Sequence, residues 1–248
     1  MDPRATAESD TNQFFPSVPH NSTKRPAEDT LPSKMQKTVA TEGLRKTEGL
    51  QTLEKYREGS YPRAQTFWSK KTVLKELSNF APIPVEVRGL TYPTGEHAYH
   101  GQKFLTLANR AAGIDNERAQ ALSRYAAGFQ SGGDIPSDPR KAKTAGGKKA
   151  MPLEAAEINE WYVNKSIAVQ FEICRNKTKE DAVRTVLIDT GKDYLLHQDN
   201  RAKGDTLWGG KFPPKWDLDA PVQLDRLTGH NRLGLIWMAV RDELDRAD

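Results

Sequence analysis

A predicted helix over residues 94–109 carries the side chains of this chain that are best suited to chemistry. Glu96, Tyr99, His100 and Lys103 recur at spacings of three and four residues, which places them on one helix face. Lys103 follows Glu96 by about 10 Å along the helix axis, so both long side chains can reach one ligand. A carboxylate can move protons, and a neutral amine can act as a nucleophile. An acid and a base on a solvated helix face fit the same pattern, so these residues alone do not identify a reaction.

Local features place the start of this helix and lead the chain into it. Pro93 ends a strand-like run, residues 85–92, whose period-two alternation and central Gly89 predict a hairpin. The Thr94 hydroxyl can accept a hydrogen bond from the backbone N–H three residues on, as an N-cap does. Glu96 then falls in the first turn, where a carboxylate suits the helix dipole.

Two further motifs contain polar and aromatic side chains. Leu-Ser-Asn-Phe occupies residues 77–80, and Asp-Thr-Leu-Trp-Gly-Gly occupies residues 205–210. Asn79 is a good turn former, Asp205 suits a turn, and Trp208 suits a core. On residue types alone these ordinary roles are favoured over ligand binding.

The remaining pattern predicts an α+β fold, a mainly helical single domain with a small sheet or hairpin. Short strands are expected at residues 66–68 and 194–196. Helices are expected at residues 117–129, 153–175, 179–190 and 233–244. The residues rich in glycine and proline, 131–139 and 211–228, should form loops.

Composition separates the N-terminal region from this domain. Hydrophobic residues make up 36% of the chain, and the mean hydropathy is -0.74, so part of the chain should stay unfolded. Residues 1–61 are expected to be a disordered, low-complexity region, with a short amphipathic helix over residues 44–57. The folded domain should span residues 62–248.

Several classes of protein are disfavoured by the composition. No apolar run approaches the roughly 20 residues of a membrane span, and the N-terminus lacks the apolar core of a signal peptide. The one cysteine, Cys174, excludes an internal disulfide and fits a reducing compartment as a buried, inert thiol. Lys24-Arg25, with Lys34 and Lys37, loosely resembles a split nuclear-import signal, although an ordinary basic patch fits as well. We expect an intracellular protein, cytoplasmic or nuclear.

A basic segment offers a candidate contact for phosphate or nucleic acid. The net charge of +4 permits a phosphate-rich partner without demanding one. The candidate cations flank a Gly-Gly pair and are Arg140, Lys141, Lys143, Lys148 and Lys149. The spacing is not that of a phosphate-binding P-loop, and a solvated loop is the common alternative. His97 and His100 lack a partner at zinc spacing, so neither a metal nor another cofactor is expected.

Taken together, the motifs resemble the YbiA-like family, also called NADAR. Its members carry Leu-Ser-Asn-Phe followed by Tyr-Pro-Thr/Ser-x-Glu-His-x-Tyr-x-x-x-Lys-Phe, which here are residues 77–80 and 92–104. Further matches follow in the family's order at Trp161, at residues 187–191, 205–209 and 231–234, and at Met238 and Arg241. The resemblance covers about residues 66–246 and implies the YbiA-like fold.

The resemblance implies a hydrolase that breaks an N-glycosidic bond at ribose C1′. One associated substrate class is ADP-ribose attached to guanine in nucleic acid, and the other is the phosphoribosylated early intermediates of riboflavin synthesis. We expect ADP-ribosylated DNA or guanine nucleotides as the substrate, because the basic segment and the pI of 9.0 favour nucleic acid. The alternative of another class is a non-catalytic ADP-ribose-binding module. No membrane and no obligate protein partner are expected.

The resemblance also assigns roles to residues. Lys103 would attack C1′ and hold the opened sugar as a Schiff base, Glu96 would move protons, and Asp205 would stabilise cationic character at C1′. The ligand-binding residues would be Ser78, Asn79, Phe80, Tyr99, Trp161, Trp208, Gly209 and Asn231.

The chain departs from the family's pattern at several places. Gln170 stands where many members have Lys, and His197 stands where many have Glu. The loops 130–150 and 211–228 are longer than usual. These differences leave the reaction type intact and bear on the choice of substrate.

Overall fold

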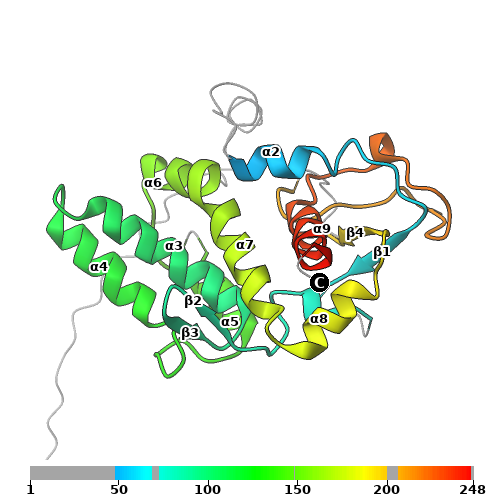
Figure 1. Ribbon diagram of the computed structural model, residues 1–248. Helices are drawn as coiled ribbons and strands as arrows, with labels where there is room; N and C mark the ends of the chain where they lie inside the picture. Colours follow the sequence, from blue (N-terminus) through cyan, green and yellow to red (C-terminus); the bar gives the residue numbers. More distant parts are fainter. Residues whose placement is uncertain (1–47, 69–72, 148, 200–205, 247–248) are drawn as a thin grey trace, which may run out of the picture. The chain divides into compact units, whose positions relative to one another are not determined.

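The computed structural model of this chain describes residues 48–68, 73–147, 149–199 and 206–246 (Figure 1). Of the region predicted to be disordered, residues 1–61, the first 47 residues with their basic patch lie outside the described residues. In chain order the elements are α2 (Glu48–Glu54), β1 (Ala64–Phe67), the 3₁₀ turn η1 (Lys75–Leu77), β2 (Val85–Val87), β3 (Leu90–Tyr92), α3 (Gly95–Ala111), α4 (Asn116–Ala127), α5 (Pro139–Ala145), α6 (Ala155–Asn159), the π-helical segment η2 (Glu160–Lys165), α7 (Ser166–Lys177), α8 (Asp181–Ile188), β4 (Tyr194–His197), the 3₁₀ turn η3 (Leu224–Arg226) and α9 (Arg232–Asp245). The predicted α+β fold, mainly helical with small sheets, is confirmed.

Two small sheets join segments at very different separations in the chain. Strands β2 and β3 form the expected antiparallel hairpin, with Val85 opposite Tyr92. Arg88 and Gly89 turn it with φ of 53° and 76°, the left-handed pair that two-residue hairpins favour. Strands β1 and β4 pair in parallel, with Phe67 opposite His197. This second pairing brings the ends of both strands to one place, although about 130 residues separate them.

Helix α7 lies between α3 and α9 (Figure 1), and its side chains enter two hydrophobic cores. One core gathers side chains of α2, β1, β4, α8 and α9, and receives Ile167 and Phe171 from α7. The other gathers α3, α4 and the β2–β3 hairpin, and receives Val169 and Ile173. Trp208 packs against both cores. Because α7 is apolar on two sides, it fixes α3 relative to β4 and α9.

Two predicted elements differ from the structure. The single helix expected over residues 153–175 is divided into α6, η2 and α7, and the backbone N–H of Ser166 donates to the carbonyl of Trp161 five residues back, which is the π-helical bond. The basic segment forms the short helix α5 instead of a loop. Asp138 caps that helix by accepting from the Arg140 N–H, and Pro139 occupies its first turn.

Helix α2 precedes Pro62, where the folded domain was expected to begin. Its Leu53, and Tyr56 just after it, are buried in the first core. The Tyr56 hydroxyl donates to the Asp242 carboxylate of α9 at 2.6 Å. The packed unit therefore includes the residues from 48 onwards.

Candidate active site

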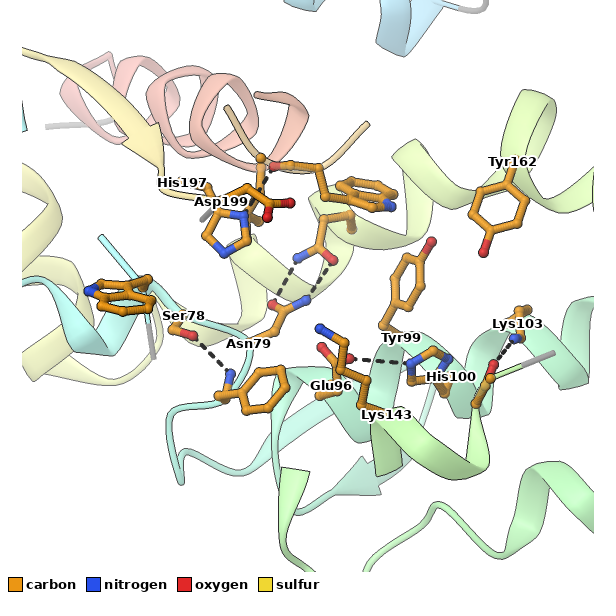
Figure 2. Close-up of a pocket in the computed structure, with 18 of the residues that line it drawn as sticks. Ser78, Asn79, Glu96, Tyr99, His100, Lys103, Lys143, Tyr162, His197 and Asp199 are labelled. Carbon is orange, nitrogen blue, oxygen red and sulfur yellow. Dashed lines mark hydrogen bonds and ion pairs between the residues drawn. The ribbon is translucent and has the colours of Figure 1, made fainter. Parts of the chain in front are cut away.

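A cavity of about 610 Å³ opens where both cores meet. Its volume lies in the range of small-molecule sites. Its charged and polar lining residues include Ser78, Asn79, Glu96, His100, Lys103, Lys143, Gln170, His197, Gln198 and Asp199. The labelled side chains spread from Ser78 and His197 at the left of Figure 2 to Lys103 and Tyr162 at the right. The cavity is therefore built from segments that span more than 130 residues of sequence.

Helix α3 presents Glu96, His100 and Lys103 to this cavity. Thr94 caps the helix as predicted, its hydroxyl accepting from the His97 N–H at 3.3 Å. Glu96 is only 9% exposed and Lys103 only 4% exposed. The alternative of an acid and a base on a solvated helix face is therefore excluded.

Glu96 is held in its ionised form by its neighbours. Burial alone would raise its pKa, but the His100 hydrogen bond and the nearby charge of Lys143 outweigh burial, so the pKa of Glu96 lies below its ordinary value. His100 Nε2 donates to Glu96 Oε1 at 3.3 Å. Burial lowers the pKa of His100 more than the carboxylate raises it, so the imidazole is neutral near pH 7. Its buried Nδ1 has no hydrogen-bond partner among the described residues.

Lys103 has no carboxylate ion-pair partner within the described part of the chain. Its Nζ donates to the carbonyl of Gly146 at 2.6 Å and lies 4.3 Å from the centre of the Phe104 ring. Burial lowers the pKa of Lys103 to about 8, although the charge of Glu96 opposes the change. About a tenth of the side chains are then neutral at pH 7, which is the form that can act as a nucleophile.

Gly146 makes this arrangement possible because it has no side chain. A Cβ built there would lie 2.0 Å from His100 Nδ1. The backbone φ of Gly146 is -73°, so the glycine is needed for space and not for an unusual conformation. The end of α5 thus touches both His100 and Lys103.

The segment 77–80 is fixed from behind by buried donors. The Lys177 ammonium donates to the carbonyls of Glu76 and Ser78 at 2.6 and 2.7 Å, and Trp237 Nε1 donates to the Leu77 carbonyl at 2.8 Å. Burial lowers the pKa of Lys177 to about 8. These bonds satisfy the backbone of a buried turn, which otherwise costs stability.

Asn79 links this segment to α3 and α7. The backbone carbonyl of Asn79 accepts a hydrogen bond from the backbone N–H of Glu96 at 2.9 Å. Its side-chain amide pairs reciprocally with that of Gln170, at 2.9 and 3.1 Å, as Figure 2 shows. Each amide satisfies a donor and an acceptor of the other, so the wall of the cavity is stiff at this point.

The end of β4 supplies the left side of the cavity in Figure 2. His197 Nδ1 donates to the Trp208 carbonyl at 3.1 Å, which fixes the tautomer and leaves Nε2 as an acceptor. Burial lowers the pKa of His197. Because Gly209 has no side chain, its backbone can lie close to the residues that follow β4: a Cβ at Gly209 would be 2.8 Å from the Cβ of Asp199.

Most predicted ligand-binding residues line the cavity, but two do not. Ser78, Asn79, Phe80, Tyr99, Trp208 and Gly209 are in the lining. Trp161 is fully buried in the core and donates its Nε1–H to the Tyr99 hydroxyl at 3.0 Å, so it supports Tyr99 and offers no stacking face. Asn231 is buried at the start of α9 and bonds the backbone of His197 and Leu195. Asp205, predicted to be catalytic, lies outside the described residues.

The basic segment contributes one cation to the cavity among those described. Lys143 lines it, and its Nζ lies 5.2 Å from the centre of the Phe80 ring. Arg140, Lys141 and Lys149 are exposed and are not in the lining. Lys148 lies outside the described residues.

Several lining residues could not be assigned from the sequence. Trp68, Tyr162, Gln198 and Asp199 all contribute to the wall. Trp68 and Asp199 follow the paired strands β1 and β4, but their own spacing carries no pattern. His100 shared the predicted helix face, yet its bond to Glu96 was not predicted, although a separation of four residues permits it.

Two properties of the described residues bear on other classes of function. No group of three or more His, Cys, Asp or Glu side chains in the described ranges is placed to bind a metal ion. None of the helices that the structure describes has the length and apolar character of a membrane span.

Comparison with known proteins gives consistent matches. The family model of the NADAR domain matches residues 66–245. The N-glycosidase YbiA of Escherichia coli (strain K12) is 26% identical over 181 residues, covering 72% of this chain and 86% of that protein. The N-glycosidase YbiA of Shigella sonnei (strain Ss046) has the same identity and coverage. The NMR structure of the E. coli protein YbiA is 24% identical, with a TM-score of 0.49 over 75% of this chain and 88% of that chain.

Proposed function

The chain belongs to the NADAR domain family, and on this premise we propose that it is an N-glycosidase that releases ADP-ribose from guanine in nucleic acid. The similar YbiA proteins are named N-glycosidases. The observation that carries the proposal is Lys103, a buried amine whose pKa of about 8 leaves it partly neutral, facing a cavity that also contains the Glu96 carboxylate.

The reaction can be written with these two residues. The bond from C1′ to the base nitrogen breaks as Lys103 Nζ bonds to C1′, and the base nitrogen takes the proton that Nζ loses. The ring oxygen then leaves C1′ and takes a proton from solvent, which gives a protonated Schiff base. Water adds to C1′ while Glu96 accepts a proton from it and passes that proton to solvent. The bond from C1′ to Nζ then breaks as Nζ takes the proton of the new C1′ hydroxyl, which frees the sugar as an aldehyde and restores the Lys103 amine.

The depressed pKa of Glu96 supports a base over an acid in this scheme. A carboxylate that is ionised at neutral pH accepts protons and stabilises positive charge at C1′, whereas a general acid needs a raised pKa. The cavity also has aromatic walls, including Trp68, Phe80 and Trp208, and flat rings favour the binding of a base.

The cations of the basic segment, residues 140–149, support nucleic acid as the carrier of the guanine. Lys143 reaches the cavity, and Arg140, Lys141 and Lys149 are exposed on the same segment. Such a cluster favours a phosphate backbone over a small metabolite.

The test compares two substrates side by side: a guanine-ADP-ribosylated DNA oligonucleotide and a phosphoribosylated intermediate of riboflavin synthesis. We expect free ADP-ribose from the first and none after Lys103→Ala. Cleavage of only the second would replace the proposed substrate and leave the N-glycosidase chemistry in place.

A single-turnover assay separates an enzyme from an ADP-ribose-binding module. A module would bind the modified oligonucleotide and release no product. We favour the enzyme, because Lys103 lies in the cavity wall, whereas Lys177, with the same pKa of about 8, lies outside the cavity lining and holds two backbone carbonyls.

A further inference from the structure

A second, smaller cavity adjoins the candidate active site. It has a volume of about 240 Å³, and Gln198 lines both cavities. Its other lining residues are Thr66, Leu196, Lys211, Phe212, Pro213, Trp216 and Leu218. The volume is below that of sites for whole drug-sized ligands and suits one flat ring. Gln198, the residue after β4, therefore lies between the two cavities.

The 211–228 loop that forms this cavity is anchored at several points. Lys211 and Thr228 pair through two backbone hydrogen bonds, of 2.9 and 3.1 Å. The Leu218 carbonyl accepts from the Ala64 N–H at 2.9 Å, and the Val222 N–H donates to residue 61 at 3.0 Å. The loop is thus held against β1 and offers a defined wall.

Two aromatic rings and the cation Lys211 line this wall, and Arg226 lies against one of the rings. The Phe212 and Trp216 rings stack with centres 5.0 Å apart and planes inclined by 17°. The Arg226 guanidinium lies 5.4 Å from the centre of the Trp216 ring, and Lys211 is exposed beside them. The buried Trp216 Nε1–H has no hydrogen-bond partner in the described ranges, so the loop itself leaves one donor unsatisfied.

We propose that this second cavity binds an unpaired nucleotide that neighbours the modified guanine in a single strand. Aromatic rings with cations beside them suit single-stranded nucleic acid, because every base has a flat face and every link carries a negative charge. Lys211 and Arg226 would bind the phosphate that joins both nucleotides, while the neighbouring base enters beside Trp216. This inference rests on the proposed function, and it specifies that the preferred substrate is a single strand that extends beyond the modified guanine.

The experiment uses the full chain and the same modified guanine in two substrates: a single-stranded oligonucleotide and the mononucleotide. We expect Trp216→Ala to lower kcat/KM about tenfold for the oligonucleotide, in keeping with the loss of one stacked base, and to leave the mononucleotide unchanged. Replacing the neighbouring nucleotides by abasic ones should have the same effect on the wild type. An equal effect of Trp216→Ala on both substrates, or no effect on the oligonucleotide, would overturn the inference.

The affinity for an unmodified oligonucleotide, and its dependence on salt, test the second cavity independently of cleavage. Lys211→Ala should reduce the slope of log affinity against log salt by about one for an unmodified oligonucleotide. Lys192→Ala is the matched control, since Lys192 is exposed and lines neither cavity. If the wild type cleaves neither modified substrate, the proposed function fails. Trp216-dependent binding of the unmodified oligonucleotide would then still support the second site, and its absence would reject that site as well.

Discussion

At the scale of single residues, the cavity keeps an amine and a carboxylate apart. Lys103 and Glu96 both lie on α3, but Lys103 bonds to the Gly146 carbonyl and Glu96 bonds to His100. A direct ion pair would raise the lysine pKa and bury the nucleophile in its charged form. The separation therefore favours a reactive amine and an ionised acid at the same pH.

The pH dependence of single-turnover cleavage should report on Lys103. Because the neutral amine attacks, and because the pKa of Lys103 is about 8, the rate should rise about tenfold per pH unit below pH 8 and level off above it. The pKa of Glu96 lies below 4.5, so Glu96 should add no ionisation in this range.

Lys103→Arg is the control for this profile. Arginine keeps the positive charge but stays protonated, so turnover should be lost while the fold is kept. A flat profile between pH 6 and pH 9, or activity in Lys103→Arg, would remove the lysine from the mechanism.

His100 is predicted to position Glu96 and to keep it ionised. His100→Phe keeps a ring against Phe129 but removes the N–H donor, so burial should raise the pKa of Glu96. Because protonated Glu96 cannot accept a proton, a second ionisation should appear below that of Lys103, and the rate should fall by more than tenfold per pH unit at acidic pH. His100→Gln keeps a donor and should retain more of the wild-type profile. The assignment fails if both variants show the wild-type limb.

At the scale of elements, the contact between α5 and α3 should be sensitive to a single methyl group. Gly146→Ala would place Cβ 2.0 Å from His100 Nδ1, so either the His100 ring or the end of α5 must shift, and with it the contact to Glu96 or the contact to Lys103. We expect a loss of about 1–3 kcal/mol in the free energy of unfolding and at least a tenfold loss of turnover. Denaturant unfolding and the pH profile measure these two effects.

Gly147→Ala provides the matched control, because its Cβ would meet only the Thr144 carbonyl closely, at 3.0 Å. It should stay near the wild type in both stability and turnover. Similar losses in both variants would mean that α5 tolerates no side chain at its end, and that the contact with His100 is not special.

The elements with local causes could be predicted from the sequence. The Thr94 cap and the regular spacing specify α3, and the turn at residues 88–89 specifies the β2–β3 hairpin. The pairing of β1 with β4 depends on packing across about 130 residues, which no local pattern encodes. For the same reason Trp68 and Asp199 could not be assigned to the cavity, whereas Glu96 and Lys103 could.

Two residues have roles that depend on burial and that were not predicted from the sequence. Lys177 has the type of a surface residue, but it is fully buried and binds two carbonyls of residues 76–78. Trp161 matches the family's motif, yet its ring supports Tyr99 from the core. Such roles depend on what surrounds a side chain, and the sequence alone does not supply that information.

At the scale of the whole molecule, stability should depend on the residues before the predicted start of the domain. A chain that begins at Pro62 loses Leu53 and Tyr56, which are buried in the first core, and the bond from Tyr56 to Asp242. We expect its free energy of unfolding to be at least about 3 kcal/mol lower than that of a chain that begins at Leu44. Thermal and denaturant unfolding of the two chains would measure the difference, and equal stability would show that α2 is dispensable.

The π-helical segment η2 bears on how this cavity can change during evolution. A π turn accommodates one residue more than an α-helix needs, which is what a one-residue insertion produces. Deleting one residue there would restore a regular helix and keep α6 in phase with α7, because the wider π turn holds the extra residue. Ile158 and Gln170, on either side of η2, would therefore stay in the cavity lining. A lineage can gain or lose one codon here and change the wall only around Tyr162, within η2, without disturbing the lining side chains that flank it.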